Sequence, residues 1–389
     1  MEVVRLNELG KLYRESYLEL MDYCFNPDAR DYFEKEFDEI TPDKGVILGM
    51  MEGESLASTV TVIQKEMTLN HEIVKMGGIA CVASSVYYRS GGMASQLMKE
   101  SLRWMVEQNI VFSLLAPFKY EFYEKFGWKL CLESLETKFS IQNLKSFQNR
   151  GRYHPLQEGN LSDISDFYHR VISDYNGSCV RTLRDFKKKF DAKNHGRGVI
   201  YQNNEGQLEG YLFYKLSPEE SKLTINELLF TTPDALASLL QFVYLHEAQV
   251  KEVVIWNYAK DLLMHRLKNP SAEWSLNPGM MGRIVQVKQA LKSYSFIGSG
   301  NFVIKVNDAL CEWNHQTFEL EVQDGKVQSI KISKSNPQIE IDIKELSQLV
   351  MGYRHLFDLI ELGEVKIFDE KILKYFPNQI AKCALYDFF

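Results

Sequence analysis

The sequence predicts a mixed α+β fold with mixed β-sheets, divided into two related units and a third α+β region. The order of segments in the first third of the chain, β-β-β-α-β-α-β, is repeated in part in the middle. A stretch rich in Pro, Gly, Asn and Ser at residues 269–283 then precedes a different pattern. A chain of 389 residues suits two or three domains, and we place them at 1–148, 149–282 and 283–389.

In the first domain the hydrophobic period changes from two to that of a helix at Gly92. Leu97, Met98 and Leu102 lie at helical spacing and predict an amphipathic helix over residues 92–107. The other predicted segments are a helical region at 10–36, two strands around a turn at 44–67, a β segment at 71–86 broken by Gly77 and Gly78, a buried strand at 110–117, and a short helix, a turn at Gly127 and a strand within 120–131.

The later domains carry fewer distinctive signals. In the second domain, three strands precede a helix that Thr232 and Pro233 open, because proline is tolerated at the first helical position. A further strand follows at 251–257. In the third domain, Asp324-Gly325 predicts a β-hairpin, and two helices are expected at "IKELSQLVMGY" and "EKILKYFP".

Charge and composition exclude several classes of protein. The formal net charge is -7 and no long basic block is present, which disfavours nucleic acid as a partner. No apolar run reaches the roughly 18 residues of a membrane span, and the N-terminus lacks the apolar core of a secretory signal. The six cysteines and eight histidines show no metal-ligand spacing. We therefore expect a cytoplasmic protein with reduced thiols, no metal and no membrane contact.

The segment "YYRSGGMA", residues 87–94, carries the most specific chemical signal. Arg89, Gly92 and Ala94 form the pattern R-x-x-G-x-A where a strand meets a helix. Glycine lets the backbone turn with positive φ and approach a ligand, and the first N–H groups of a helix attract anions. The pattern indicates a pyrophosphate site. The simpler interpretation is a Gly-Gly turn with a solvated arginine, because short glycine patterns recur by chance.

The segments on either side of the loop favour the anion site. Val82 and Ser84 lie on the entering strand, where splayed backbone amides would pair with an extended, amide-bearing ligand arm. A buried strand and "FYEKFGW" follow the helix. This combination resembles the GNAT acyltransferases, whose loop holds the pyrophosphate of acetyl-CoA and whose preceding strand pairs with pantetheine. The resemblance implies acetyl-CoA as co-substrate, bound by Val82, Ala83, Ser84, Arg89, Ser90, Gly91, Gly92, Met93 and Ala94.

The resemblance extends over essentially the whole chain. "RSGGMASQLM", "SLLAPFKYEFYEKFGW", a second GNAT-like unit without the loop and a third region beginning "GRIVQV" resemble the Eis-type (enhanced intracellular survival) N-acetyltransferases. This implies an active GNAT domain, a degenerate GNAT-like domain and a sterol-carrier-like C-terminal domain. It also implies a homo-oligomer, a hexamer in the family. The implied acceptors are amines such as aminoglycosides, polyamines or lysine side chains, and the sequence does not choose among them.

Two residues are predicted to catalyse the transfer. Tyr123 matches the tyrosine that the family uses as general acid, because amine attack on the thioester expels a thiolate that a protonated phenol can neutralise. Its alternative role is a core residue packed with Phe122 and Phe126. The family's C-terminal carboxylate acts as base through water, which points to Phe389. The alternative is an apolar terminus that docks for stability.

We therefore expect an acetyl-CoA-dependent N-acetyltransferase in which an amine attacks the thioester directly. Aromatic and acidic residues at 22–36 either line the acceptor pocket or belong to an ordinary amphipathic helix. Two other classes stay open. One is a non-catalytic protein that binds acyl-CoA or an apolar ligand, and the other is a thiol-dependent enzyme that uses Cys81.

Overall fold

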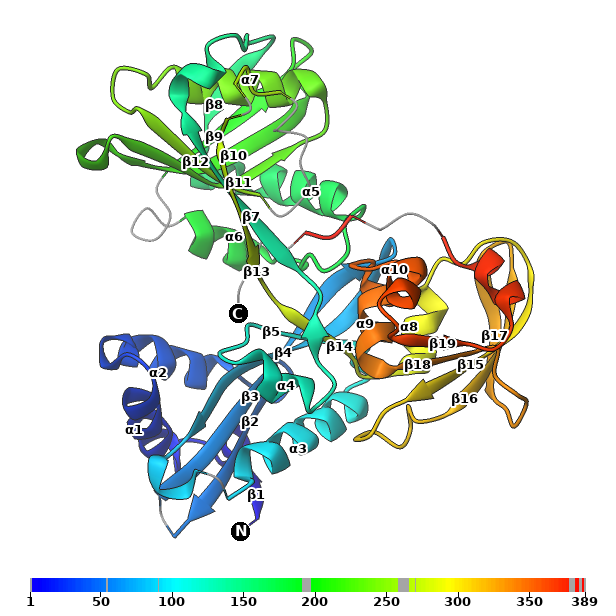
Figure 1. Ribbon diagram of the computed structural model, residues 1–389. Coiled ribbons are helices and arrows are strands. Elements are labelled where there is room, and N and C mark those ends of the chain that lie inside the picture. The colour runs from blue at the N-terminus through cyan, green and yellow to red at the C-terminus, as the bar shows by residue number, and fades with distance from the viewer. Residues whose placement is uncertain are drawn as a thin grey trace. The chain divides into compact units, whose positions relative to one another are not determined.

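The computed structural model describes residues 2–53, 55–89, 91–190, 197–257, 266–269, 271–377, 382–384 and 387. The chain divides into two compact units (Figure 1). Unit 1 combines residues 1–131, 280–381 and 387–389, and unit 2 combines residues 132–279 and 382–386. The chain therefore leaves unit 1 after Cys131 and returns to it at Met280, so each unit joins segments that are distant in the sequence.

Unit 1 contains a sheet of seven strands, counted over the described residues, in which one neighbouring pair is parallel. The parallel pair lies near the middle of the sheet, and the other neighbours are antiparallel. The spatial order is β1 (Val3–Arg5), β2 (Gly45–Glu52), β3 (Ser55–Leu69), β4 (Glu72–Ser84), β5 (Phe112–Leu115), β14 (Met281–Ile284) and β6 (Lys129–Leu130).

Helices cover both faces of this sheet (Figure 1). On one face pack α1 (Arg14–Cys24) and α2 (Arg30–Glu39), and on the other pack α3 (Met93–Glu107) and α4 (Tyr120–Glu124). Alternate residues of β2 point to opposite clusters, as the period of a strand requires. The helical region expected at 10–36 is thus two helices, and Pro27, which has no N–H to donate, lies between them.

The glycine pair in the third β segment does not break the strand, so that expectation was wrong. Strand β4 runs from Glu72 to Ser84 without interruption. A Cβ on Gly77 would come within 3.0 Å of the Met105 side chain on α3. Glycine is present here because the helix packs closely over the strand. From the sequence alone, this reason for a glycine looks the same as a turn.

Unit 2 has a second seven-stranded sheet among the described residues, again with one parallel pair, β11 and β12. Helices α5 (Leu161–Ile172) and α6 (Leu183–Phe190) pack on one face, and α7 (Pro233–Tyr244) packs on the other. The spatial order is β13 (Glu273–Pro278), β7 (Glu133–Ser140), β12 (Glu252–Asn257), β11 (Lys222–Phe230), β10 (Leu208–Ser217), β9 (Arg197–Gln202) and β8 (Arg152–Pro155).

The third region is a smaller α+β domain within unit 1. Its predicted hairpin is confirmed, with Asp324 at φ 49° and Gly325 at φ 78°, both in the left-handed region that a two-residue hairpin turn requires. The expected last helix is a 3₁₀ helix, Glu370–Tyr375. The elements are the strands β17 (Lys326–Ile332), β16 (Thr317–Gln323), β15 (Gly300–Asn307), β18 (Ile339–Asp342) and β19 (Val365–Ile367), with helices α8 (Val287–Ser293), α9 (Ile343–Met351) and α10 (Leu356–Glu361).

The Pro- and Gly-rich stretch before the third region supplies two strands. Strand β13 pairs with β7 in unit 2, and β14 inserts between β5 and β6 in unit 1. At Gly282 a Cβ would lie 2.7 Å from a ring carbon of Phe112, so only glycine permits this insertion. Strand β7, which lies before the expected domain boundary at 148, pairs with β12 in the second sheet. The domain boundaries at 148 and 282 stay predictions.

A buried ion pair joins the first sheet to the third region. Arg283 on β14 donates from Nη2 to both carboxylate oxygens of Asp308, at 2.9 and 2.7 Å. The two side chains are 0% and 1% exposed. Nη1 of Arg283 donates to the backbone carbonyl of Phe126. Three segments that are distant in the sequence thus meet at one guanidinium.

We predict that Asp308→Ala lowers the free energy of unfolding of unit 1 by about 3–5 kcal/mol, because the guanidinium of Arg283 would stay buried without a counter-charge. Urea unfolding followed by circular dichroism measures the change. Glu319→Ala, which removes an exposed ion pair with Lys331, is the control and should change stability by less than about 1 kcal/mol. Equal effects of the two substitutions would contradict the prediction.

Candidate active site

Strand β4 extends beyond the end of its parallel partner β5. Their paired residues end at Ile79 and Leu115. Strand β4 continues to Ser84, and there it is paired with β3 alone among the described residues. The backbone of residues 80–84 therefore offers a free edge on the β5 side. A free strand edge binds an extended chain that carries amide groups.

A β-bulge lies where this free edge begins. The register between β3 and β4 shifts between Thr59 and Thr61, and Cys81 opposite them has φ 49°. A non-glycine residue at positive φ is uncommon, and bulges re-aim side chains near functional sites. As a result Cys81 packs toward the cluster of α1 and α2, while Val82 packs toward the cluster of α3 and α4.

The predicted anion loop lies between the free edge and helix α3. Gly92 adopts φ 76° and ψ 4° as the N-terminal cap, and no side chain among the described residues caps the helix. The first N–H groups of α3 are thus available to a ligand, and a Cβ on Gly92 would have no atom within 4 Å. Arg89 is exposed, and its Nε donates to the carbonyl of Ser84 at 3.3 Å. The loop therefore presents one cation and open amides to solvent.

The structure brings most of the predicted cofactor residues into one continuous surface. Val82, Ala83 and Ser84 belong to the free edge, and the hydroxyl of Ser84 is 2.7 Å from the hydroxyl of Ser58. Ser90 lies outside the described residues. The loop and helix start are formed by Arg89, Gly91, Gly92, Met93 and Ala94. An extended cofactor with a pyrophosphate at one end fits this arrangement.

Tyr123 is a buried residue of α4. It is 2% exposed and belongs to the same apolar cluster as Ile79 and Val82 of β4. Its ring centroid lies 5.4 Å from that of Phe118 and 5.0 Å from that of Phe122. Burial raises the pKa of Tyr123, so the phenol holds its proton at neutral pH. The packing role and the acid role are compatible, because the same side chain serves both.

The turn after Tyr123 is fixed in place. The N–H groups of Phe126 and Trp128 both donate to the carbonyl of Tyr123, at 2.9 and 3.3 Å. Gly127 has φ 85°, and a Cβ there would lie 1.7 Å from Nη1 of Arg283. The predicted turn at Gly127 is confirmed, and the reason for glycine is both the positive φ and the buried arginine.

Cys81 is a poor nucleophile in this environment. Burial and the nearby carboxylate of Glu36 raise the pKa of Cys81 to about 12. The thiolate is the reactive form of cysteine, so the thiol-dependent mechanism loses its support. Sequence reasoning could not find this contact, because Glu36 lies 45 residues before Cys81.

The second predicted catalytic residue, Phe389, lies outside the described residues. Its role as base stays a prediction. None of the helices in the described part of the chain is both long and apolar enough to cross a membrane.

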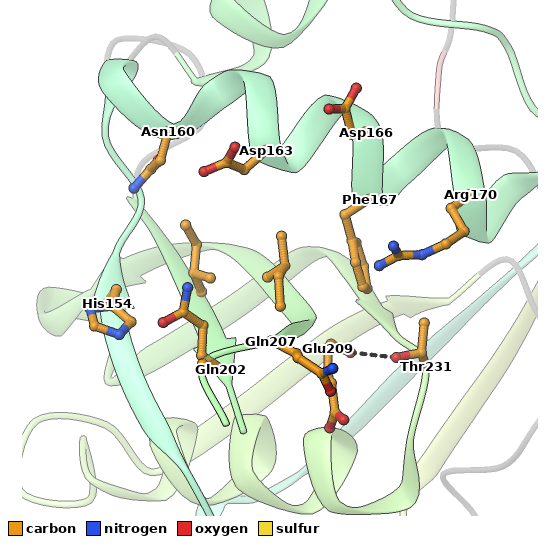
Figure 2. Close-up of a pocket in the computed structure, with 13 residues that line it drawn as sticks. His154, Asn160, Asp163, Asp166, Phe167, Arg170, Gln202, Gln207, Glu209 and Thr231 are labelled. Atoms are coloured by element: carbon orange, nitrogen blue, oxygen red, sulfur yellow. Dashed lines mark hydrogen bonds between the residues drawn. The ribbon is translucent and has the colours of Figure 1, made fainter. Parts of the chain in front are cut away.

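A polar hollow of about 820 Å³ lies in unit 2, between α5 and strands β9 and β10 (Figure 2). Two of its charged groups have partners within the fold: Glu209 accepts from Thr232 at 2.8 Å, and the guanidinium of Arg170 lies over the ring of Phe167. It contains none of the predicted site residues, and we assign it no function. The lining residues are His154, Asn160, Asp163, Asp166, Phe167, Arg170, Ile200, Gln202, Gly206, Gln207, Leu208, Glu209 and Thr231.

Known protein families match all three regions. Acetyltransferase (GNAT) domain models match residues 6–131 and 177–284, and a sterol carrier protein domain model matches residues 287–383. An uncharacterized N-acetyltransferase of Streptomyces avermitilis is 22% identical over 352 residues, 82% of each chain.

Solved structures share the fold over the whole chain. A probable N-acyltransferase of Enterococcus faecalis has a TM-score of 0.88 at 23% identity, covering 100% of this chain and 99% of its own. A GCN5-related N-acetyltransferase of Anabaena variabilis has a TM-score of 0.84 at 20% identity, covering 97% of both chains. Eis1 of Mycobacterium abscessus has a TM-score of 0.80 at 16% identity, covering 100% of both chains.

The fold and these matches define a GNAT acetyltransferase, and acetyl transfer is its activity in general terms. More specifically, the chain combines two GNAT domains with a sterol carrier protein domain, the architecture expected from the Eis-type resemblance, and it shares the fold of Eis1 over its whole length. The family and fold class expected from the sequence are thereby confirmed. GNAT domains use acetyl-CoA in general, which agrees with the expected co-substrate.

We predict that Gly92→Asp weakens acetyl-CoA binding at least tenfold, or about 1.4 kcal/mol. The added carboxylate would stand beside the open amides of α3 and repel a pyrophosphate. Isothermal titration calorimetry measures the affinity. Gly92→Asn is the matched control, because asparagine tolerates the left-handed conformation and adds no charge. Equal affinities of the two variants would show that no anion binds at this loop.

Proposed function

We propose that the first GNAT domain transfers an acetyl group from acetyl-CoA to an amine by direct attack, without an acyl-enzyme. The observation that carries this proposal is the free edge of β4, which leads to a helix start with no cap from a described side chain and whose residue Val82 packs in the same apolar cluster as Tyr123. A pyrophosphate at residues 89–94 and a pantetheine arm along Ser84 to Val82 would bring the thioester to the point where β4 and β5 separate.

The second GNAT domain lacks the features that would make it a second active site. Helix α7 begins with Pro233, which has no N–H, and the Thr232 hydroxyl accepts from the N–H of Ala235 at 3.1 Å. One of the N–H donors that a pyrophosphate would use is therefore missing and another is already paired. Of the two helix starts, the one at Gly92 is suited to the cofactor.

In the proposed reaction the amine nitrogen attacks the thioester carbonyl carbon. The new N–C bond forms and the C–S bond breaks, and the electron pair of that bond leaves on sulfur. The Tyr123 hydroxyl protonates the thiolate, and the proton lost by the amide nitrogen restores the phenol. A phenol whose pKa burial has raised stays protonated until this step.

The proposal also covers the acceptor, the cellular location and the partners of the enzyme. Acceptors are free amines, either small molecules or lysine side chains, and the residues at 22–36 border the acceptor approach. We place the enzyme in the cytoplasm, as a homo-oligomer without nucleic acid partners. The family resemblance and the overall negative charge support these assignments.

We predict that Tyr123→Phe lowers kcat by about 10²–10⁴-fold, because general acid catalysis contributes a factor of this size. The substitution keeps the buried ring, so the melting temperature and the Kd for acetyl-CoA should hold. Thiol release from acetyl-CoA with a panel of amines measures turnover. Tyr120→Phe, on the same helix, is the control and should keep wild-type turnover. A kcat within threefold of wild type in Tyr123→Phe would make Tyr123 a packing residue only.

A further inference from the structure

The C-terminal tail of the chain is bound within the unit of the second GNAT domain. We refer to residues 382–384 as the tail segment and to residues 175–178 as the clamp. The N–H of Asn176 donates to the carbonyl of Lys382 at 2.7 Å, and the N–H of Ala384 donates to the carbonyl of Asn176 at 3.1 Å. These two bonds belong to a parallel β-bridge. One residue of the clamp therefore holds two backbone groups of the tail segment.

Side chains of the clamp add to this bridge. The hydroxyl of Ser178 donates to the carbonyl of Ala384 at 2.9 Å, and Nζ of Lys382 lies 5.6 Å from the ring centroid of Tyr175. Ser178 is 0% exposed and Ala384 is 1% exposed. Loss of the donor from a buried carbonyl is more costly than loss of an exposed hydrogen bond. The tail segment is therefore packed into unit 2 and held there by specific contacts.

The clamp is anchored to the rest of unit 2 by buried polar groups. The guanidinium of Arg181, three residues after Ser178, donates to both carboxylate oxygens of Glu227 on β11, at 2.9 and 2.8 Å. These two side chains are 1% and 0% exposed. The hydroxyl of Tyr168 on α5 donates to the carbonyl of Cys179 at 2.8 Å. Burying an ion pair is costly, and fixing the clamp accounts for the presence of this one.

The clamp restricts the end of the chain. The tail segment belongs to unit 2, whereas Asp387 belongs to unit 1, which contains the first GNAT domain. Ala384 lies five residues before Phe389, and five extended residues span at most about 18 Å. The last buried residue described before the tail segment is Phe376, thirteen residues before the terminus. Without the clamp, the terminal carboxylate would be tethered by a much longer segment.

We propose that the clamp in the second GNAT domain holds the C-terminal tail and thereby positions the carboxylate of Phe389 as the general base of the reaction. This proposal rests on the proposed amine acetylation, and it makes Asn176 and Ser178 positioning residues. The carboxylate takes one proton from the acceptor's ammonium group, through water, and releases it to solvent after transfer. The steps at the thioester and at Tyr123 are unchanged, so the net products are an amide, free CoA and one proton.

The length of the tether sets the expected size of the effect. The effective concentration of a tethered group falls roughly as the −3/2 power of the tether length. Release from the clamp lengthens the tether from five residues to thirteen, which lowers the effective concentration of the carboxylate about fourfold by this relation. Loss of its orientation adds to this effect. We therefore expect kcat to fall at least about fourfold when the tail leaves the clamp.

The first test releases the tail by substitution in the full chain. Ala384→Glu places a larger, charged side chain in a buried position, and Ala384→Gly, which keeps every backbone bond, is its matched control. Thiol release from acetyl-CoA with the best amine should show kcat lower by at least about fourfold in Ala384→Glu. The Kd for acetyl-CoA should stay unchanged, and Ala384→Gly should keep wild-type kcat.

A second pair of variants tests the clamp itself. Ser178→Ala removes the hydroxyl that binds the tail segment, and it should lower kcat in the same direction by a smaller factor. Ser173→Ala is the matched control, because this exposed serine donates to the carbonyl of Arg170 at 2.8 Å and not to the tail. It should keep wild-type kcat. Equal effects of the two substitutions would contradict a specific role of the clamp.

A double-variant cycle separates positioning from a structural effect. A short flexible extension after Phe389 converts its carboxylate to an amide and moves the terminal charge, while the clamp stays intact. The extension alone should lower kcat, and Ala384→Glu should lower it no further in the extended chain, because both changes act through the same carboxylate. Losses that add in the double variant, or an extended chain with wild-type kcat, would overturn the positioning role.

Trypsin tests the binding of the tail without reference to activity. Cleavage after Lys382 requires the tail segment to leave the β-bridge, so a released tail should be cut faster. Mass spectrometry should show faster loss of residues 383–389 in Ala384→Glu than in the wild type or Ala384→Gly. Equal rates in all three proteins would overturn the proposal. If the wild type releases no thiol with any amine while this cleavage pattern holds, the proposed function fails instead.

Discussion

The proposed active site depends on one feature of the sheet, the extension of β4 beyond the end of its parallel partner β5. Strands β4 and β5 are hydrogen-bonded as far as Ile79 and Leu115, and beyond that point β4 continues alone on that side. Only a separated strand leaves backbone groups free inside an otherwise complete sheet. The bulge at Cys81 begins this free edge, and the loop with Gly92 ends it. The positions proposed for the cofactor and the acid both follow from this geometry.

A second constraint holds Tyr123, the proposed acid, in place. Strand β14 returns from a distant part of the sequence to pair with β5, and its Arg283 is held by Asp308 of the sterol-carrier-like region and bonded to the carbonyl of Phe126. Lys129, three residues after Phe126, forms ion pairs with Glu345 and Glu364 of the same region, each at 2.7 Å. The third domain therefore fixes the turn that follows Tyr123, and so supports the proposed active site structurally.

The sequence predicted the parts of the fold and of the candidate site that depend on local signals. The period change at Gly92, the glycine at 127 and the Asp324-Gly325 hairpin were each marked by residues adjacent in the chain, and the structure has these elements. Tertiary packing decided the rest. The reason for glycine at 77 is the Met105 side chain, and the reason for glycine on the inserted strand β14 is the ring of Phe112. Glu36 contacts Cys81 only because α2 packs on the sheet. No spacing rule contains such contacts, because they join residues that are far apart in sequence.

The central claim is that acetyl-CoA and an amine react directly in one ternary complex. Initial rates measured with acetyl-CoA and the best amine varied together test it most directly. Direct attack predicts double-reciprocal lines that intersect, and it predicts no mass increase of the protein after incubation with acetyl-CoA alone. Parallel lines together with an acetylated protein would show an acyl-enzyme by ping-pong kinetics, and would contradict the account.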